Sequence, residues 1–170
     1  ARAENLYTLA SISGPAASTT LLLNINALPF YNRLKHFVPN FQNVCPMCNG
    51  GSYDPEHIFK CPKIFDLWIA AEDNHTFRLG INLLQAGNFH LSQPCTLADT
   101  FILTAMIHTV WTIARMMLYL KVPFGYAAAS HIFKRALKSI KQIELHNHRD
   151  RKGLRNEDTL DTLCHALQDL

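Results

Sequence analysis

Glycine and proline are scarce in this chain of 170 residues, which has 7 glycines and 8 prolines. Their scarcity excludes a collagen-like chain and a flexible linker. Charged residues make up only 17%, whereas hydrophobic residues reach 48%, so the composition excludes an intrinsically disordered chain. The sequence also lacks sustained polar–apolar alternation and long internal repeats. It therefore predicts an all-α fold of about one domain.

Cysteine is too sparse, at five residues, for a small disulfide-stapled scaffold, and the odd number would leave one thiol over. Three of the five fall within residues 45–61, which favours a metal site in a reducing, intracellular compartment. The first apolar run, at residues 21–23, is too short for a signal peptide. Because the sequence does not begin with Met, we expect a fragment or a processed chain.

One apolar run, residues 101–120, is long enough to cross a membrane. It contains His108 and Arg115, and an arginine in a spanning helix costs about 2.5–3.5 kcal/mol on insertion scales. We therefore expect the central helix of an all-α domain and no membrane association. Trp111 shares a face of that helix with His108 and Arg115. We expect Trp111 and His108 to belong to the core, and Arg115 to pair with an acid or to cap carbonyls.

Breakers and helix caps predict three parts: an N-terminal arm over residues 1–17, a zinc-binding helical domain over residues 18–155, and a C-terminal helix over residues 156–170. Thr96 and Asp99 have capping-box spacing, which predicts that the long central helix begins there. Residues 76–93 predict a short helix and a loop. The other expected helices run over residues 18–28, 29–39 and 126–146, with one more beginning at Pro62.

A C-x2-C pair followed after eight residues by H-x3-C occupies residues 45–61. The C-x2-C turn places two thiolates on one side of a tight loop, and Gly50 and Gly51 let the chain reverse. Asp54 and Pro55 look like a helix cap and a first helical residue, so a helix would place the histidine and the last cysteine one turn apart. Two ligands from each part can surround a tetrahedral Zn²⁺ ion. The predicted ligands of this CCHC zinc knuckle are Cys45, Cys48, His57 and Cys61.

Four protein ligands leave no open coordination position, which favours a structural zinc ion and predicts no enzymatic activity. Lys60 and Lys63 could offset the charge of three thiolates. Glu56 is either a partner of the imidazole or an ordinary acid of a first helical turn. The alternative for the cluster is a set of buried thiols or a labile disulfide.

Several features follow one another along the chain: the stretch at residues 27–37, a Cys-Pro-x-Cys pair, a Glu-His pair, a Cys-Pro pair and a segment with Trp68. Their order resembles the zinc-binding region downstream of the polymerase domain in non-LTR (LINE-type) retrotransposon reverse transcriptases. Trp111 and Arg115 resemble a later helix of that family. The likeness spans about residues 21–120, and this chain has one residue fewer than is usual between the histidine and the last cysteine.

The resemblance assigns the metal ligands to the same four residues, Cys45, Cys48, His57 and Cys61. It does not extend to polymerase chemistry, because the chain has no paired-aspartate polymerase motif and no Pro-Asp nuclease signature. What it implies is a non-catalytic region that handles nucleic acid.

Basic residues concentrate in the predicted basic helix and tail, residues 121–155, which hold nine Lys or Arg and two acids. Clustered cations bind a polyanion by releasing its counterions. The alternatives are an ordinary solvated helix face, or an amphipathic helix that binds an anionic membrane surface or a calcium sensor. The candidate nucleic-acid-binding residues are Lys121, Lys134, Arg135, Lys138, Lys141, Arg149, Arg151, Lys152 and Arg155.

These features support two main hypotheses. The first is a zinc-stabilised module that binds RNA or DNA, with RNA as the expected partner, acting in the nucleus or cytoplasm as part of a retroelement protein. The second is a domesticated structural subunit of a ribonucleoprotein such as a mitochondrial ribosome, in which the apolar helices contact protein neighbours. A hydrolytic or redox enzyme is a third class, which the closed ligand set disfavours.

Overall fold

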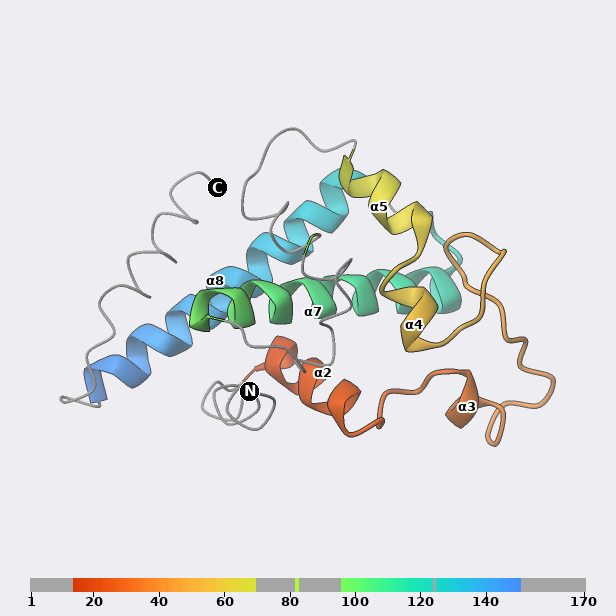
Figure 1. Cartoon of the computed structure of the whole chain (residues 1–170), viewed down its shortest axis with the longest axis horizontal. Helices are drawn as coiled ribbons and strands as arrows, with labels where there is room; N and C mark the ends of the chain where they lie inside the picture. Colours follow the sequence, from red (N-terminus) through yellow and green to blue (C-terminus); the bar gives the residue numbers. More distant parts are fainter. Residues whose placement is uncertain (1–13, 70–81, 83–95, 124, 151–170) are drawn as a thin grey trace.

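The computed structural model describes residues 14–69, 82, 96–123 and 125–150 (Figure 1). Within these ranges every regular element is a helix and no strand occurs, so the predicted all-α class is confirmed. Several predictions fall elsewhere in the chain and lie outside the described residues. They are the C-terminal helix over residues 156–170, almost all of the segment 76–93, and the candidate residues Arg151, Lys152 and Arg155.

The long helix α7, Leu97–Leu120, begins where the sequence predicts. The Thr96 hydroxyl accepts a hydrogen bond from the Asp99 amide at 3.0 Å, and the Asp99 carboxylate accepts one from the Thr96 amide at 3.1 Å. This reciprocal pair satisfies two amides that a helix start otherwise leaves without partners. The helix ends at Lys121, which has left-handed backbone geometry with φ 55°.

Helix α7 runs through the middle of the fold (Figure 1), where it packs against both α2 and α8. By length and composition Ala98–Leu120 could cross a membrane, but 67% of its most apolar window is buried inside the molecule. Side chains on several sides of α7 are buried, among them Phe101, Leu103 and Val110. The prediction of a central core helix is therefore confirmed.

Helix α2, Pro15–Asn24, corrects two predictions at the start of the chain. Pro15 takes the first helical position, which its fixed φ favours, so this helix begins before the predicted start at residue 18. The Thr19 hydroxyl donates within the helix, to the Pro15 carbonyl at 2.7 Å. Ala16 and Ala17 are buried in the core and do not belong to an arm. The helix also ends four residues before the predicted end at Leu28.

Helix α8, Tyr126–Asp150, begins at the predicted residue and extends four residues beyond the predicted end at His146. It packs against α7 and extends toward the side of the molecule away from α3 (Figure 1). Its buried side faces α7 and carries Phe133, Leu137 and Ile140, which recur at helical spacing.

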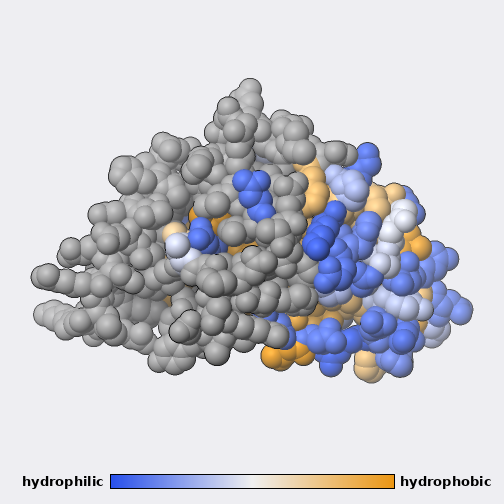
Figure 2. Space-filling model, in the orientation of Figure 1, coloured by the Kyte–Doolittle hydropathy of each residue, from blue (hydrophilic) through white to orange (hydrophobic). Residues whose placement is uncertain are grey.

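The other described helices are short and lie within or next to residues 45–61, which we call the Cys/His segment. They are α3, Tyr31–Leu34; α4, Pro55–Ile58; and α5, Pro62–Ile69. The helix predicted over residues 29–39 is reduced to α3, and residues 35–37 continue from it as a turn. As a result Phe37 is 80% exposed. Figure 2 shows a largely hydrophilic surface at this end of the molecule, interrupted by separate hydrophobic patches.

An aromatic cluster joins the Cys/His segment to α7. The Trp111 ring lies 5.0 Å from that of Phe30 and 6.5 Å from that of Tyr53, measured between centroids. Phe30 also contacts Phe59, at 6.3 Å and with an edge-to-face geometry. All four rings are buried. Trp111 is therefore a core residue, as predicted, and it fixes the Cys/His segment against the central helix.

Candidate metal centre

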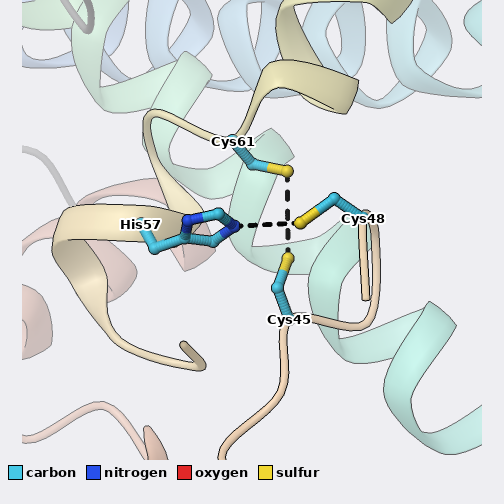
Figure 3. A group of neighbouring side chains, drawn as sticks. All are labelled: Cys45, Cys48, His57 and Cys61. Atoms are coloured by element: carbon cyan, nitrogen blue, oxygen red, sulfur yellow. Dashed lines mark hydrogen bonds between the residues drawn. The ribbon is translucent and has the colours of Figure 1, made fainter. Parts of the chain in front are cut away.

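Four side chains point toward one another beside α4 (Figure 3), and their ligand atoms all lie within 4.8 Å of one another. The sulfurs of Cys45 and Cys61 are 3.8 Å apart, and the Cys48 sulfur lies 3.1 Å from His57 Nε2. A tetrahedral zinc ion with Zn–S bonds of about 2.3 Å separates two thiolates by about 3.8 Å. The four residues that the sequence singled out therefore could hold a metal ion, and their spacing is compatible with zinc.

The start of α4 fixes the position of His57. Asp54 is the N-cap, and its carboxylate accepts a hydrogen bond from the His57 amide at 2.9 Å. Pro55 follows as the first helical residue, which confirms the predicted cap. The Ser52 hydroxyl donates to the other carboxylate oxygen of Asp54. The cap is thus held from both sides, and the imidazole leaves the helix toward the cysteines.

The expectation that His57 and Cys61 share one helix is wrong. Helix α4 ends at Ile58, and Cys61 begins the next helix, where its carbonyl accepts from the Ile64 amide at 2.9 Å. Pro62 explains the break, since it has no amide hydrogen and disfavours helical geometry in the preceding residue. Cys61 is therefore a cap residue of α5, and the turn between the two helices brings it back over His57.

The loop between Cys48 and α4 uses its glycines differently from the prediction. The left-handed residue that turns the chain is Asn49, with φ 56°. Gly51 is needed for space, because a Cβ atom there would lie 2.0–2.4 Å from three atoms of the His57 ring. A Cβ atom on Gly50 would meet only the Cys48 carbonyl oxygen, at 3.8 Å. Gly51 therefore allows the imidazole to reach the cysteines.

Backbone amides face the sulfurs. The Gly50 amide donates to Cys48 Sγ at 3.4 Å. Hydrogen bonds from the amides of Met47 and Cys48 lower the pKa of the Cys45 thiol. Those from the amides of Lys63 and Ile64 lower the pKa of the Cys61 thiol. These dipoles stabilise negative charge on sulfur, which is the form that binds a metal.

The Cys45 thiol donates a hydrogen bond to the Cys61 sulfur across their 3.8 Å contact. The hydrogen bond from the Cys45 thiol lowers the pKa of Cys61, and the same bond together with burial raises the pKa of Cys45. A divalent cation at this position would take the place of the Cys45 thiol proton, because both sulfurs would then be bound as thiolates.

Only two of the four donors are fully shielded from solvent. Cys45 and Cys61 have no exposed surface, whereas Cys48 and His57 are half-buried. Glu56 points away and pairs with Lys60 at 3.4 Å, so of its two predicted roles the structure shows the ordinary acid of a first helical turn. With four donors this arrangement suits a structural ion, because no coordination position is left for a substrate.

The structure places five of the predicted nucleic-acid-binding residues. Arg135, Lys138 and Lys121 are exposed, while Lys134 and Lys141 are half-buried. Arg149 lies in α8, but its side chain is outside the described residues, as are Arg151, Lys152 and Arg155. The candidate nucleic-acid-binding residues that the structure describes therefore lie along α8, except Lys121, which follows the last residue of α7.

Sequence reasoning missed one feature, the environment of His108. This residue is half-buried, and its Nδ1 lies 3.0 Å from the Thr19 hydroxyl oxygen of α2. Burial and the nearby positive charge of Arg115 lower the pKa of His108. Because the contact spans 89 positions of the chain, no local pattern indicates it.

Comparison with known proteins adds no relative, because no protein-family model, no curated protein and no solved structure matches the chain.

Proposed function

We propose that the chain is a non-catalytic helical module, stabilised by one structural Zn²⁺ ion on Cys45, Cys48, His57 and Cys61, that binds nucleic acid through α8. The metal part of the proposal is supported by the spacing of the four donors and by the backbone amides directed at the sulfurs. Zn²⁺ would supply no reaction step here, since its role in such a closed site is to hold loop and helices together.

The observation that carries nucleic-acid binding is the charge of α8. From Tyr126 to Ile143 the sequence has four Lys or Arg and no acid. Arg135 and Lys138 are exposed there, so their positive charge reaches solvent. Cations that share one helix face without intervening acids neutralise neighbouring phosphates, which gives affinity for any nucleic acid. RNA is the proposed partner, in line with the resemblance to LINE-type reverse transcriptases.

The salt dependence of binding tests this function. We expect the zinc-loaded chain to bind single-stranded RNA with an affinity that falls linearly with salt on a log–log plot. In the double variant Lys138→Gln/Lys141→Gln the slope of that plot should become shallower by roughly 1.4, since each lost phosphate contact on a single strand removes about 0.7. Fluorescence anisotropy with a labelled oligonucleotide measures both slopes.

The matched control is Lys35→Gln/Lys60→Gln, which removes the same charge near the Cys/His cluster, where both lysines are exposed. If the two double variants change the slope equally, the affinity comes from net charge and not from α8. An absence of RNA binding in the unmodified chain would reject the function itself.

A structural subunit of a ribonucleoprotein is the second candidate, favoured by exposed apolar side chains. Phe37 is 80% exposed, Ile25 is 71% exposed and Leu120 is 60% exposed. Exposed apolar side chains mark a protein contact where they form one contiguous patch, which this candidate function requires. Co-purification of the tagged chain with a ribosome-sized particle, retained in high salt, would favour this function over free RNA binding.

A further inference from the structure

A pocket of about 360 Å³ lies where α2, α7 and α8 meet, on the part of the surface that includes Arg135. Pro15 and Ala16 at the start of α2 form one wall, and Ile132 and Ala136 of α8 form another, so both walls are apolar. This volume falls in the range of pockets that hold small organic ligands, about 300–1,000 Å³. It is larger than a single inorganic ion requires.

Polar groups line the rest of the pocket, and none of the lining residues is acidic. His131 and Arg135 lie one turn apart on α8 and are both exposed, so the imidazole and the guanidinium form its rim. Ser139, one turn further along, contributes a hydroxyl. A guanidinium beside hydroxyl and imidazole groups is suited to binding a phosphate.

His108 also lines the pocket, and its contacts fix which ring nitrogen is available. The Thr19 hydroxyl gives its only hydrogen to the Pro15 carbonyl, so it accepts from His108 Nδ1–H at 3.0 Å. A neutral imidazole has one N–H, so Nε2 carries a lone pair. Burial keeps the ring neutral by lowering its pKa. Nε2 is therefore left as a hydrogen-bond acceptor.

We propose that this α2–α7–α8 pocket binds one unstacked nucleotide, with its phosphate at Arg135 and His131 and its base between the apolar walls, where an N–H of the base donates to His108 Nε2. The proposal rests on the proposed function and adds the unit of the nucleic acid that is recognised. Lys138 lies one turn of α8 from Arg135, which lets one strand contact both the pocket and the lysines.

Titration of the zinc-loaded chain with adenosine 5′-monophosphate tests the pocket, with adenosine and inorganic phosphate as separate ligands. We expect the monophosphate to bind roughly tenfold tighter than either part alone, because it fills both the walls and the rim. Arg135→Gln should weaken its binding roughly tenfold through the loss of a charge-assisted contact. Isothermal titration calorimetry measures each affinity.

Lys35→Gln is the control, since it removes the same charge from an exposed residue outside the pocket. It should change the affinity for the monophosphate less than twofold, as it does not line the pocket. Equal losses in both variants, or equal affinity for phosphate and the monophosphate, would overturn the nucleotide assignment. In ¹⁵N-labelled protein, His108 should show the Nδ1–H tautomer, and its Nε2 resonance should shift with the monophosphate but not with phosphate.

The outcomes separate this inference from the function on which it rests. RNA binding without saturable binding of the monophosphate overturns the pocket and leaves the function intact. Binding of the monophosphate without RNA binding overturns the function and supports the pocket as a site for free nucleotides.

Discussion

Gly51 lies against the ring of His57, so any larger side chain at this position would collide with the imidazole. In Gly51→Ala the new Cβ atom would overlap the imidazole, so the ring must leave its place beside Cys48. We expect zinc affinity to fall by about 10–100-fold, the range seen when groups that orient a ligand are altered. Competition with a chromophoric zinc chelator measures the affinity.

Gly50→Ala is the control for this prediction, because a Cβ atom there has ordinary contacts. It should bind zinc within about threefold of the unmodified chain, which allows for the context dependence of such effects. Similar affinities for the two variants would show that the imidazole does not need the space that Gly51 provides.

At the same scale, His108 should make stability depend on pH. Burial first and Arg115 second lower its pKa in the folded state, so the unfolded chain takes up this proton more readily. The pocket adds Arg135 and His131 from α8, while Thr19 faces the ring from α2. The contribution of neutral His108 to the free energy of unfolding is therefore fully present above pH 6.5, its ordinary pKa, and is lost as the pH falls below that value.

Denaturant unfolding between pH 7.5 and 5.5 tests this in His108→Gln, which keeps a polar side chain but removes the titration. We expect its stability to fall less over this range than that of the unmodified chain. His131→Gln, at an exposed position, should follow the unmodified chain. A steeper loss in His108→Gln than in the unmodified chain would contradict the assignment.

Residue identities in the Cys/His segment were predictable because the donors are close in sequence. The spacing of Cys45, Cys48, His57 and Cys61 required no knowledge of the rest of the fold. The role of Gly51 was not predictable, since it depends on where a ring six positions later points. The partner of His108 lies 89 positions away and leaves no local pattern.

Among the elements, α7 depends on its first turn. Thr96→Ala removes the hydroxyl that accepts from the Asp99 amide. Loss of such a cap costs about 1 kcal/mol, and because α7 packs against both α2 and α8 the whole fold should lose that stability. Urea unfolding monitored by circular dichroism measures it.

Thr96→Ser keeps the hydroxyl and is the matched control for the cap. It should retain most of the free energy of unfolding, since serine caps a helix as well as threonine does. If serine destabilises as much as alanine, the hydrogen bond is not what stabilises the start of α7.

The start of α7 was predicted correctly, and two other helix boundaries were missed although their causes, Pro15 and Pro62, are also local. The capping box at Thr96 placed the start of α7. The start of α2 was predicted too late, because Thr19 resembles a cap in sequence but bonds inside the helix. The break between α4 and α5 was missed because the spacing of His57 and Cys61 also fits one helical turn.

For the whole molecule, removal of the metal should destabilise the Cys/His segment more than the core of α2, α7 and α8. Among the described helices that pack closely, α2, α7 and α8 contact one another. The Cys/His segment joins this core through the contact of α4 with α7. Chelation should therefore leave most of the helical circular dichroism intact. It should release the aromatic cluster, which is tied to the loop through Tyr53 and Phe59.

Fluorescence of Trp111 in a Trp68→Phe background reports this directly, because it is then the only tryptophan. Its emission should shift to longer wavelength with a chelator and return with Zn²⁺. Complete loss of helical signal on chelation would show instead that the cluster supports the entire fold.

The short span of the donor set has a consequence for the order in which the chain folds. Cys45 and Cys61 are 16 positions apart, whereas Thr19 and His108 are 89 positions apart. Closing the longer loop costs about 1.5 kcal/mol more in chain entropy. The Cys/His segment can thus assemble while α7 and α8 are still being synthesised, and it presents Phe59 and Tyr53 as a surface on which Trp111 later packs.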